Sequence, residues 1–110
     1  MPRTYGEIIA QLKPTIERSP ERFMRFYDKV YLLLSAIPAG KAIFVREHCT
    51  ERSREIFLNV AEMVIIEDHI HRDPLKGWLD FNDDKTMISR GVDVTPIRVR
   101  RHFYTDKNGI

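Results

Sequence analysis

The sequence predicts a single α+β domain that is mostly helical and carries one small β-hairpin. Its 110 residues match the usual length of one domain. Hydrophobic residues make up 43% of the chain and aromatic residues 10%, enough for a core without disulfides or metals. Apolar residues recur at helical spacing as far as Ile70, and the spacing becomes strand-like after Pro74. We therefore expect residues 1–110 to form one domain.

The first predicted element is an N-terminal helix within residues 1–19. Thr4 followed three residues later by Glu7 matches a capping box, which marks a helix start. Apolar residues then follow at helical spacing: Ile8, Ile9, Leu12 and Ile16. Pro14 is expected to kink or end this helix, because proline lacks the backbone N–H group.

A second helix is predicted to start at Ser19-Pro20 and to stop at residues 38–40. Serine at the N-cap and proline at the first helical position are typical of a helix start. Its apolar and aromatic stripe is expected to face the core and consists of Phe23, Phe26, Tyr27, Val30, Tyr31, Leu34 and Ile37.

The middle of the chain predicts a long helix after an ambiguous segment. Residues 41–49 fit a short helix or a brief strand, because four apolar residues cannot decide the type. Thr50 is a candidate N-cap for a helix that extends to Ile70. The second half of this helix is apolar nearly all round. It is therefore either central in the core or shared with a partner chain.

The end of the chain predicts strands. Lys76 to Arg90 is expected to form a β-hairpin with its turn at residues 82–84. Residues 92–100 alternate between apolar and polar side chains, but Pro96 limits them to an edge strand or an extended arm. Residues 106–110 are expected to be a loose tail.

The order helix, connector, short helix, longer helix and hairpin resembles the winged helix-turn-helix superfamily of DNA-binding domains. The resemblance covers residues 22–90 and rests on element order, without a diagnostic motif. It implies a three-helix winged-helix-like core, preceded by the helix in 1–19 and followed by a basic C-terminal arm, 91–110. It also implies that residues 50–70 carry the recognition helix and that residues 82–85 form the wing. The expected function is a small double-stranded-DNA-binding protein, either a transcription regulator or a mobile-element or phage-type accessory factor.

Basic residues support this reading only in part. The net charge is +2, which does not by itself indicate a nucleic-acid binder. However, residues 67–84 carry six acidic and two basic side chains, and residues 85–110 carry two acidic and six basic ones. The candidate DNA-binding residues are Arg46, Arg52, Ser53, Arg54, Lys85, Arg98, Arg100 and Arg101. The alternative is that these charges form a solvated helix face and the outer face of an edge strand.

Acidic residues count against contact between the wing and DNA. Asp80, Asp83 and Asp84 surround the hairpin turn and would be repelled by phosphate. A protein–protein interaction module is therefore the alternative function, with Trp78, Phe81 and Tyr104 as candidate anchors. A homodimer is also expected from the surplus apolar surface of the longest helix.

Enzyme chemistry is not expected, and neither a cofactor nor a metal is predicted. Glu67 to Asp73 is the one cluster with metal-type ligands, and a polar helix end is its simpler interpretation. On a continuous helix, Glu67 and His71 would share a face while His69 would point away. Cys49 is the single cysteine and is expected to be buried, which favours a reducing compartment. With no secretory signal or membrane-spanning stretch recognised, a cytoplasmic location is expected.

Overall fold

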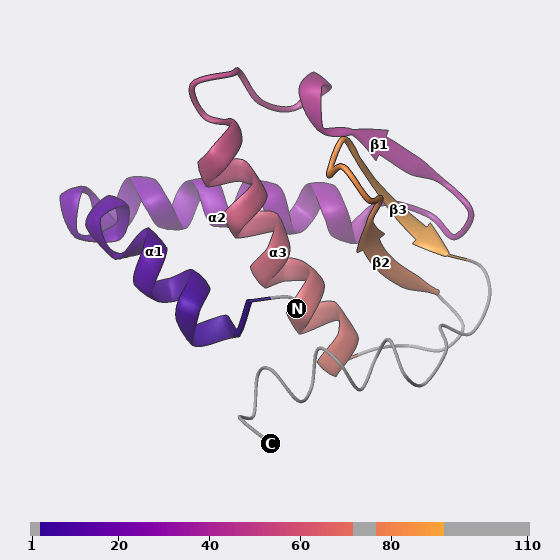
Figure 1. Ribbon diagram of the computed structural model, residues 1–110, viewed down its shortest axis with the longest axis horizontal. Helices are drawn as coiled ribbons and strands as arrows, with labels where there is room; N and C mark the ends of the chain where they lie inside the picture. The colour runs from indigo at the N-terminus through magenta and orange to yellow at the C-terminus, as the bar shows by residue number, and fades with distance from the viewer. Residues whose placement is uncertain (1–2, 72–76, 92–110) are drawn as a thin grey trace.

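The computed structural model describes residues 3–71 and 77–91. Within these ranges the chain forms three α-helices and a three-stranded antiparallel sheet (Figure 1). The elements are α1 (Tyr5–Arg18), α2 (Pro20–Ser35), β1 (Ala42–Phe44), the 3-10 helix η1 (Val45–Glu47), α3 (Arg54–Ile70), β2 (Trp78–Phe81) and β3 (Met87–Gly91). The expected α+β class, mostly helical with a small hairpin, is confirmed.

Helix α1 starts as predicted but does not end at its proline. The Glu7 N–H donates to Thr4 Oγ1 at 3.1 Å, and the Thr4 N–H donates to Glu7 Oε1 at 3.1 Å. The helix continues through the exposed Pro14 to Arg18. Burial of Ile8 and Leu12 holds the helix against the core, and this offsets the one hydrogen bond that proline removes. Of the two outcomes expected at Pro14, a kink or an end of the helix, the end is therefore wrong.

Helix α2 starts and packs as predicted. Pro20 occupies its first turn, and Phe23, Val30 and Leu34 are buried. Tyr31 departs from the expected core stripe because 47% of its surface is exposed. It therefore lies at the rim of the helix interface, where its hydroxyl reaches solvent.

The ambiguous segment before α3 forms both a strand and a helical turn, because β1 is followed directly by η1. The short second helix of the expected helix-turn-helix is thus reduced to this single turn. Helix α3 begins at Arg54 with Ser53 as N-cap, not at Thr50. The Thr50 N–H donates to Ser53 Oγ at 3.0 Å and the Ser53 N–H donates to Thr50 Oγ1 at 3.2 Å, so the two residues hold a turn ahead of the helix.

Helix α3 is the centre of the core and contacts α1, α2 and β2. Figure 1 shows it crossing α2, with α1 beside it. Its residues from Phe57 to Ile66 are buried, with the exception of the half-buried Leu58. Of the two alternatives left open for this helix, the central position is the one observed. The apolar surface that motivated a homodimer is therefore covered by the chain itself.

The three strands follow the order β1-β3-β2, so the last strand of the hairpin is the central one. Ile43 pairs with Ile88 on one side of β3, and Asp80 pairs with Ser89 on the other. The turn of the hairpin is fixed by Asn82, whose Oδ1 accepts from the backbone N–H groups of Thr86 and Met87, both at 2.9 Å. The predicted hairpin is confirmed, whereas the arm predicted for residues 92–100 lies outside the described residues.

Two acidic side chains of α3, the buried Glu62 and the half-buried Asp68, pair with basic residues from distant segments. Glu62, in the middle of the helix, pairs with Arg3 from the segment ahead of α1. Asp68, near the end of the helix, pairs with Arg90 of β3. In the part of the chain that the structure describes, no helix has the length and apolar character needed to cross a bilayer.

Candidate nucleic-acid interface

The N-terminal end of α3 is the part of this helix that reaches solvent. Arg54 and Glu55 in its first turn are exposed, as are Glu51 and Arg52 in the preceding turn. Beyond Phe57 the helix is covered by its neighbours. A large ligand can therefore meet only the start of this helix.

Three arginines from three different elements meet in a groove beside this end, which we call the three-helix groove. Arg18 is the last residue of α1, Arg22 lies in the first turn of α2, and Arg52 lies in the turn before α3. The groove has a volume of about 810 Å³. It is lined by Thr15, Arg18, Ser19, Arg22, Phe23, Phe26, Arg52, Ser53 and Ile56. None of these lining residues is acidic.

The helix starts at this groove add to its positive potential. The hydroxyl of Ser19 makes no capping hydrogen bond to α2, and the hydroxyl of Ser53 makes none to α3. Both helices exceed fifteen residues, at 16 and 17 respectively, and an uncapped helix start carries a partial positive charge. The two starts therefore reinforce the guanidinium groups.

A second groove lies between η1, the start of α3 and the hairpin, and we call it the hairpin groove. Its volume is about 500 Å³, and its lining includes Arg46, Arg54, Phe44, Thr86 and the acidic Glu51. The Arg46 guanidinium lies 5.6 Å from the centroid of the Phe44 ring, which is 43% exposed. The two grooves therefore bring Arg46, Arg52 and Arg54 to the same end of α3.

The arginines of both grooves form no ion pair and no side-chain hydrogen bond with any residue in the described ranges. Two acidic residues, Glu17 and Glu55, are next to groove arginines in the sequence. Glu55 accepts a hydrogen bond from Gln11 at 3.3 Å, and Glu17 pairs with Lys13 at 3.8 Å. Glu17 and Glu55 are thus engaged with other partners, and Glu51 is the one acidic residue that lines either groove. The guanidinium groups of the three-helix groove therefore meet no acidic lining residue that would compete with an anionic ligand.

Cys49 lines the hairpin groove but is a weak candidate for a nucleophile. Its thiol donates to the carbonyl oxygen of Val45 at 3.3 Å. Partial burial raises the pKa of this thiol, and the nearby Arg54 opposes the rise. A raised pKa keeps the sulfur in its unreactive thiol form at neutral pH. The residue is half-buried, less than the full burial expected.

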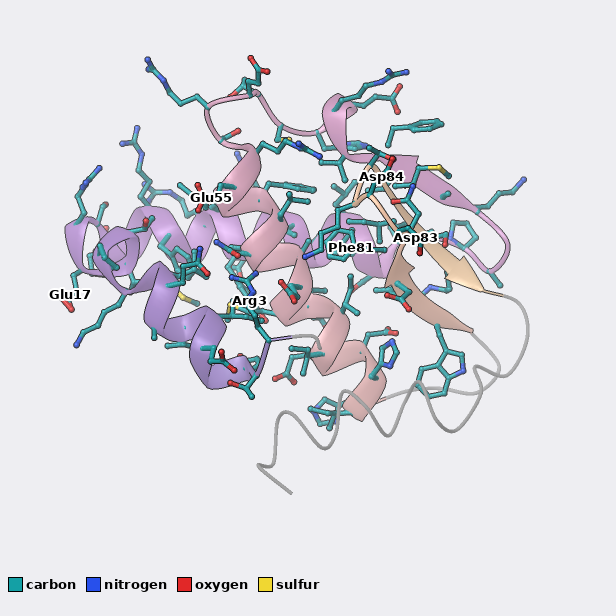
Figure 2. The ribbon with its side chains drawn as sticks, in the orientation of Figure 1. Arg3, Glu17, Glu55, Phe81, Asp83 and Asp84 are labelled. Carbon is teal, nitrogen blue, oxygen red and sulfur yellow. The ribbon has the colours of Figure 1, made fainter. Side chains whose placement is uncertain are left out.

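The hairpin tip does not join this basic surface. Lys85 Nζ lies 4.0 Å from Glu62 Oε2 and 5.6 Å from the centroid of the Phe81 ring, so this lysine is turned toward α3. Asp83 and Asp84 are exposed at the tip (Figure 2). The Thr86 hydroxyl donates to Asp84 Oδ1 at 2.7 Å, and this lowers the pKa of Asp84. The tip that faces solvent is therefore acidic.

The structure thus brings together some of the residues predicted from the sequence. Arg46, Arg52, Ser53 and Arg54 lie around the start of α3, whereas Lys85 lines neither groove. The predicted Arg98, Arg100 and Arg101 lie outside the described residues. Sequence reasoning missed Arg18 and Arg22. The Ser-Pro helix start between them indicates a corner of the chain, but not that this corner meets the turn before α3.

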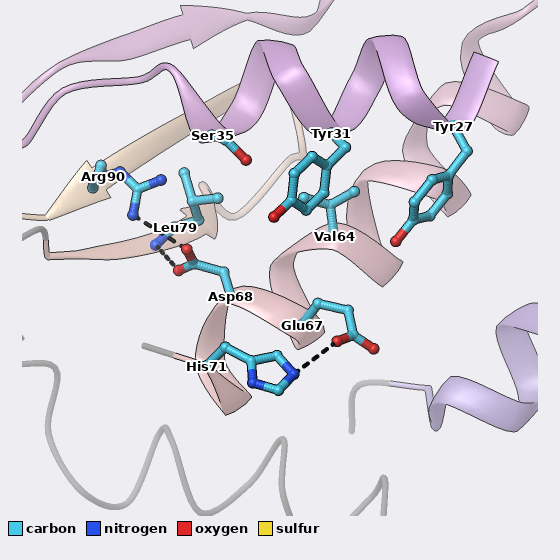
Figure 3. Close-up of a pocket in the computed structure, with 9 residues that line it drawn as sticks. All are labelled: Tyr27, Tyr31, Ser35, Val64, Glu67, Asp68, His71, Leu79 and Arg90. Atoms are coloured by element: carbon cyan, nitrogen blue, oxygen red, sulfur yellow. Dashed lines mark hydrogen bonds and ion pairs between the residues drawn. The ribbon is translucent and has the colours of Figure 1, made fainter. Parts of the chain in front are cut away.

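The cluster at the end of α3 borders a separate pocket of about 290 Å³ (Figure 3). Tyr27 and Tyr31 of α2 face Glu67 of α3 across it, and Glu67 Oε2 lies 3.4 Å from His71 Nε2. His69 points the other way, into the core, where its Nε2 lies 2.8 Å from the Leu79 carbonyl oxygen. The predicted facing of these side chains is confirmed. No three described His, Cys, Asp or Glu residues gather in a geometry suited to a metal ion.

Trp78 is not available as an anchor for a protein partner. Its side chain is 3% exposed, and its ring centroid lies 4.9 Å from that of His69. Phe81 is half-buried, and Tyr104 lies outside the described residues. The prediction of Trp78 as an anchor is wrong, because the inner face of the hairpin is covered by α3.

Comparison of the chain with protein-family models, with curated proteins and with solved structures finds no match. The basic grooves at the start of α3 are therefore the basis on which a function is proposed.

Proposed function

We propose that this protein is a small winged-helix-like domain that binds double-stranded DNA through the basic end of α3. The observation that carries this proposal is the gathering of Arg46, Arg52 and Arg54 around one helix start without an ion pair to any described residue. Charged guanidinium groups without a protein partner are the groups that bind phosphate oxygens.

The order of elements supports the winged-helix assignment. Helix α2, the helical turn η1, helix α3 and the hairpin β2–β3 follow one another as the resemblance requires. Strand β1 adds to this arrangement, since it pairs with β3 and holds the segment before η1 against the hairpin. The start of α3 is thereby held in a fixed position relative to the hairpin.

Burial of α3 limits how this domain would contact DNA. A recognition helix reads base edges with side chains that point into the major groove. Here most side chains from Phe57 to Ile66 are enclosed by α1, α2 and the sheet, so we expect the first turn of the helix to reach the duplex. We therefore expect contacts to phosphates to dominate, with weak discrimination between sequences.

The hairpin is expected to stay clear of the duplex. Asp83 and Asp84 at its tip would be repelled by phosphates, and Lys85 is directed to Glu62. Additional phosphate contacts are proposed for the C-terminal arginines, Arg98, Arg100 and Arg101. A role in transcription regulation or as an accessory factor, a cytoplasmic location and a homodimer all remain predictions.

Fluorescence anisotropy with a blunt-ended duplex of random sequence, titrated at several low salt concentrations, tests the proposal. We expect wild-type binding at low salt, with an affinity that falls as salt rises. The double variant R46A/R54A should bind at least tenfold more weakly, on the order expected when two phosphate contacts are lost, and with a shallower salt dependence.

The matched control for this experiment is R25A/K29A, which removes the same charge from exposed positions of α2 that line neither groove. An equal loss of affinity in this control would show that net charge, and not the start of α3, drives binding. Absence of wild-type binding at low salt would refute the proposal outright.

An interaction with another protein is the second candidate function, favoured by an exposed apolar face on α2. Met24, Tyr31 and Leu32 are 53%, 47% and 68% exposed. Residues seven and eight positions after Met24 lie on the same side of a helix, so the three form one patch. Sedimentation velocity over a range of protein concentrations tests a second copy of this chain as the partner. A dimer that M24S/L32S dissociates would support this alternative, and a monomer at all concentrations would contradict it.

A further inference from the structure

The three-helix groove is a concave site, and contact with a DNA duplex does not require a concave site. Arginines on a convex surface suffice to bind the phosphates of paired DNA. Here Arg18, Arg22 and Arg52 line a groove of about 810 Å³, within the size range of sites that enclose a small organic molecule. The groove therefore suits a ligand that enters the protein, in addition to one that lies across it.

The lining of the groove divides into a charged part and an apolar part. Three guanidinium groups and the hydroxyls of Thr15 and Ser19 can donate hydrogen bonds to an anion, whereas the Ser53 hydroxyl is engaged with Thr50. Phe26 and Ile56 are half-buried and present apolar surface to the same space, above the buried Phe23. A phosphate joined to a flat ring would match both parts at once.

The charge around the groove favours a phosphate over a cation or a neutral group. The four acidic residues adjacent in sequence to its lining residues, Glu17, Glu21, Glu51 and Glu55, are all exposed and none is among the lining residues. Glu17 is paired with Lys13. The side chains that face the interior of the groove are therefore positive, hydroxylic or apolar.

We propose that the three-helix groove binds one unpaired nucleotide of a DNA strand, with its phosphate against Arg18, Arg22 and Arg52 and its base against Phe26 and Ile56. This inference rests on the proposed DNA binding and deepens it, because it names the form of DNA preferred. A base within a duplex is stacked on both sides and cannot enter a groove. The domain therefore prefers duplex ends that carry a single-stranded overhang.

Anisotropy titrations with a blunt duplex and with the same duplex extended by a short single-stranded overhang test this preference. We expect the wild-type protein to bind the overhang form roughly tenfold more tightly, the scale of one stacked base with its phosphate contact. The R22Q variant should lose this preference and retain most of its affinity for the blunt duplex. The matched control is R25Q, which removes the same charge from an exposed position of α2 outside the groove and should keep the preference.

A second measurement does not depend on duplex binding. Adenosine monophosphate added to the labelled protein should shift the NMR signals of Arg22, Phe26 and Ile56, and inorganic phosphate should leave those of Phe26 and Ile56 in place. The R22Q variant should show weaker shifts while giving a dispersed spectrum that reports an intact fold.

The outcomes separate the two proposals. Equal affinity for blunt and overhang duplexes would overturn the inference and leave duplex binding standing. Binding of the overhang and of the mononucleotide without any binding of the blunt duplex would overturn the proposed function and support the groove. Identical shifts with phosphate and with the mononucleotide would also overturn the inference, because they would show an anion site that does not contact a base.

Discussion

Arg90 Nη1 lies 3.2 Å from Asp68 Oδ1, and this ion pair joins the central strand of the sheet to the end of α3. Only 6% of the arginine side chain and 19% of the aspartate side chain are exposed. The same guanidinium donates to the carbonyl oxygen of Ile37 at 2.7 Å, just after α2. One side chain thus connects the sheet to two helices.

Replacing Arg90 with methionine is expected to destabilise the fold by about 3 kcal/mol, because Asp68 would lose its cationic partner in a largely buried position and retain only the hydrogen bond from the Leu79 N–H. Urea unfolding at neutral pH measures the effect. The control is Lys13→Met, which breaks an exposed pair whose side chains are 72% and 63% accessible and should cost less than about 0.5 kcal/mol. Similar losses in the two variants would mean that the Arg90 pair does not stabilise this fold.

Gly77 is expected to tolerate no side chain. Its φ angle is +83°, and a Cβ atom placed there would lie 1.7 Å from the carbonyl oxygen of Gly91. We expect Gly77→Ala to lower the free energy of unfolding by about 2 kcal/mol or more, from the left-handed backbone and the clash together. Thermal unfolding followed by circular dichroism measures the change.

Gly91 provides the control for that substitution on the facing strand. A Cβ atom at Gly91 would lie 4.0 Å from the carbonyl oxygen of Trp78, which is ordinary van der Waals contact. Gly91→Ala should therefore change the melting temperature only slightly. A melting temperature for Gly77→Ala as high as that of Gly91→Ala would contradict the close backbone approach between the two strands.

Two aspartates of the hairpin are expected to influence stability with opposite signs as pH changes. Burial raises the pKa of Asp80 above its ordinary value of 3.8, although the Phe81 N–H that it accepts opposes the rise. The pKa of Asp80 is therefore higher in the folded state than in the unfolded state. As pH rises from the unfolded-state pKa to the folded-state pKa, ionisation of Asp80 lowers the free energy of unfolding. The Asp80→Asn variant should be more stable than the parent above this window and equal to it below pH 3.8.

Asp84, in the turn of the same hairpin, is expected to show the opposite dependence of stability on pH. Hydrogen bonds from the Thr86 hydroxyl and backbone N–H lower the pKa of Asp84 from its ordinary value of 3.8. The ionised form is therefore favoured by folding, and its contribution is lost as pH falls through the folded-state pKa. Asp84→Asn should be less stable than the parent at neutral pH and should converge with it in acid. Urea titrations from neutral to acidic pH measure both variants, and a shared sign would contradict these assignments.

Much of the local structure was predictable because it depends on neighbours in the sequence. The capping box of Thr4 and Glu7, the Ser-Pro start of α2 and the turn at Asn82 are satisfied by contacts within a few residues. The helix end expected at Pro14 was predicted from the backbone hydrogen bond that proline removes, which is a local effect. The helix continues through Pro14 because burial of Leu12 holds it against the core.

The candidate site was less predictable, because long-range packing assembles it. Arg52, Ser53 and Arg54 were identified as the start of a predicted recognition helix, but Arg18 and Arg22 join Arg52 only through the packing of α1 and α2 against α3. Alternation in the hairpin likewise identified Trp78 as part of a strand, but not that its face is covered by α3. The spacing of apolar residues predicts the helices and strands and the apolar face of each. Only the tertiary structure shows which other elements those faces contact.

The division of α3 into an exposed start and an enclosed remainder has a consequence for how this protein can change. Substitutions at residues 51, 52, 54 and 55 alter a solvent-facing surface. Substitutions from Phe57 onward alter side chains held by α1, α2 and the sheet. On the proposed function, ligand preference and thermodynamic stability are encoded in different stretches of one helix. A change of target can proceed through a few surface positions without compensating changes in the interior.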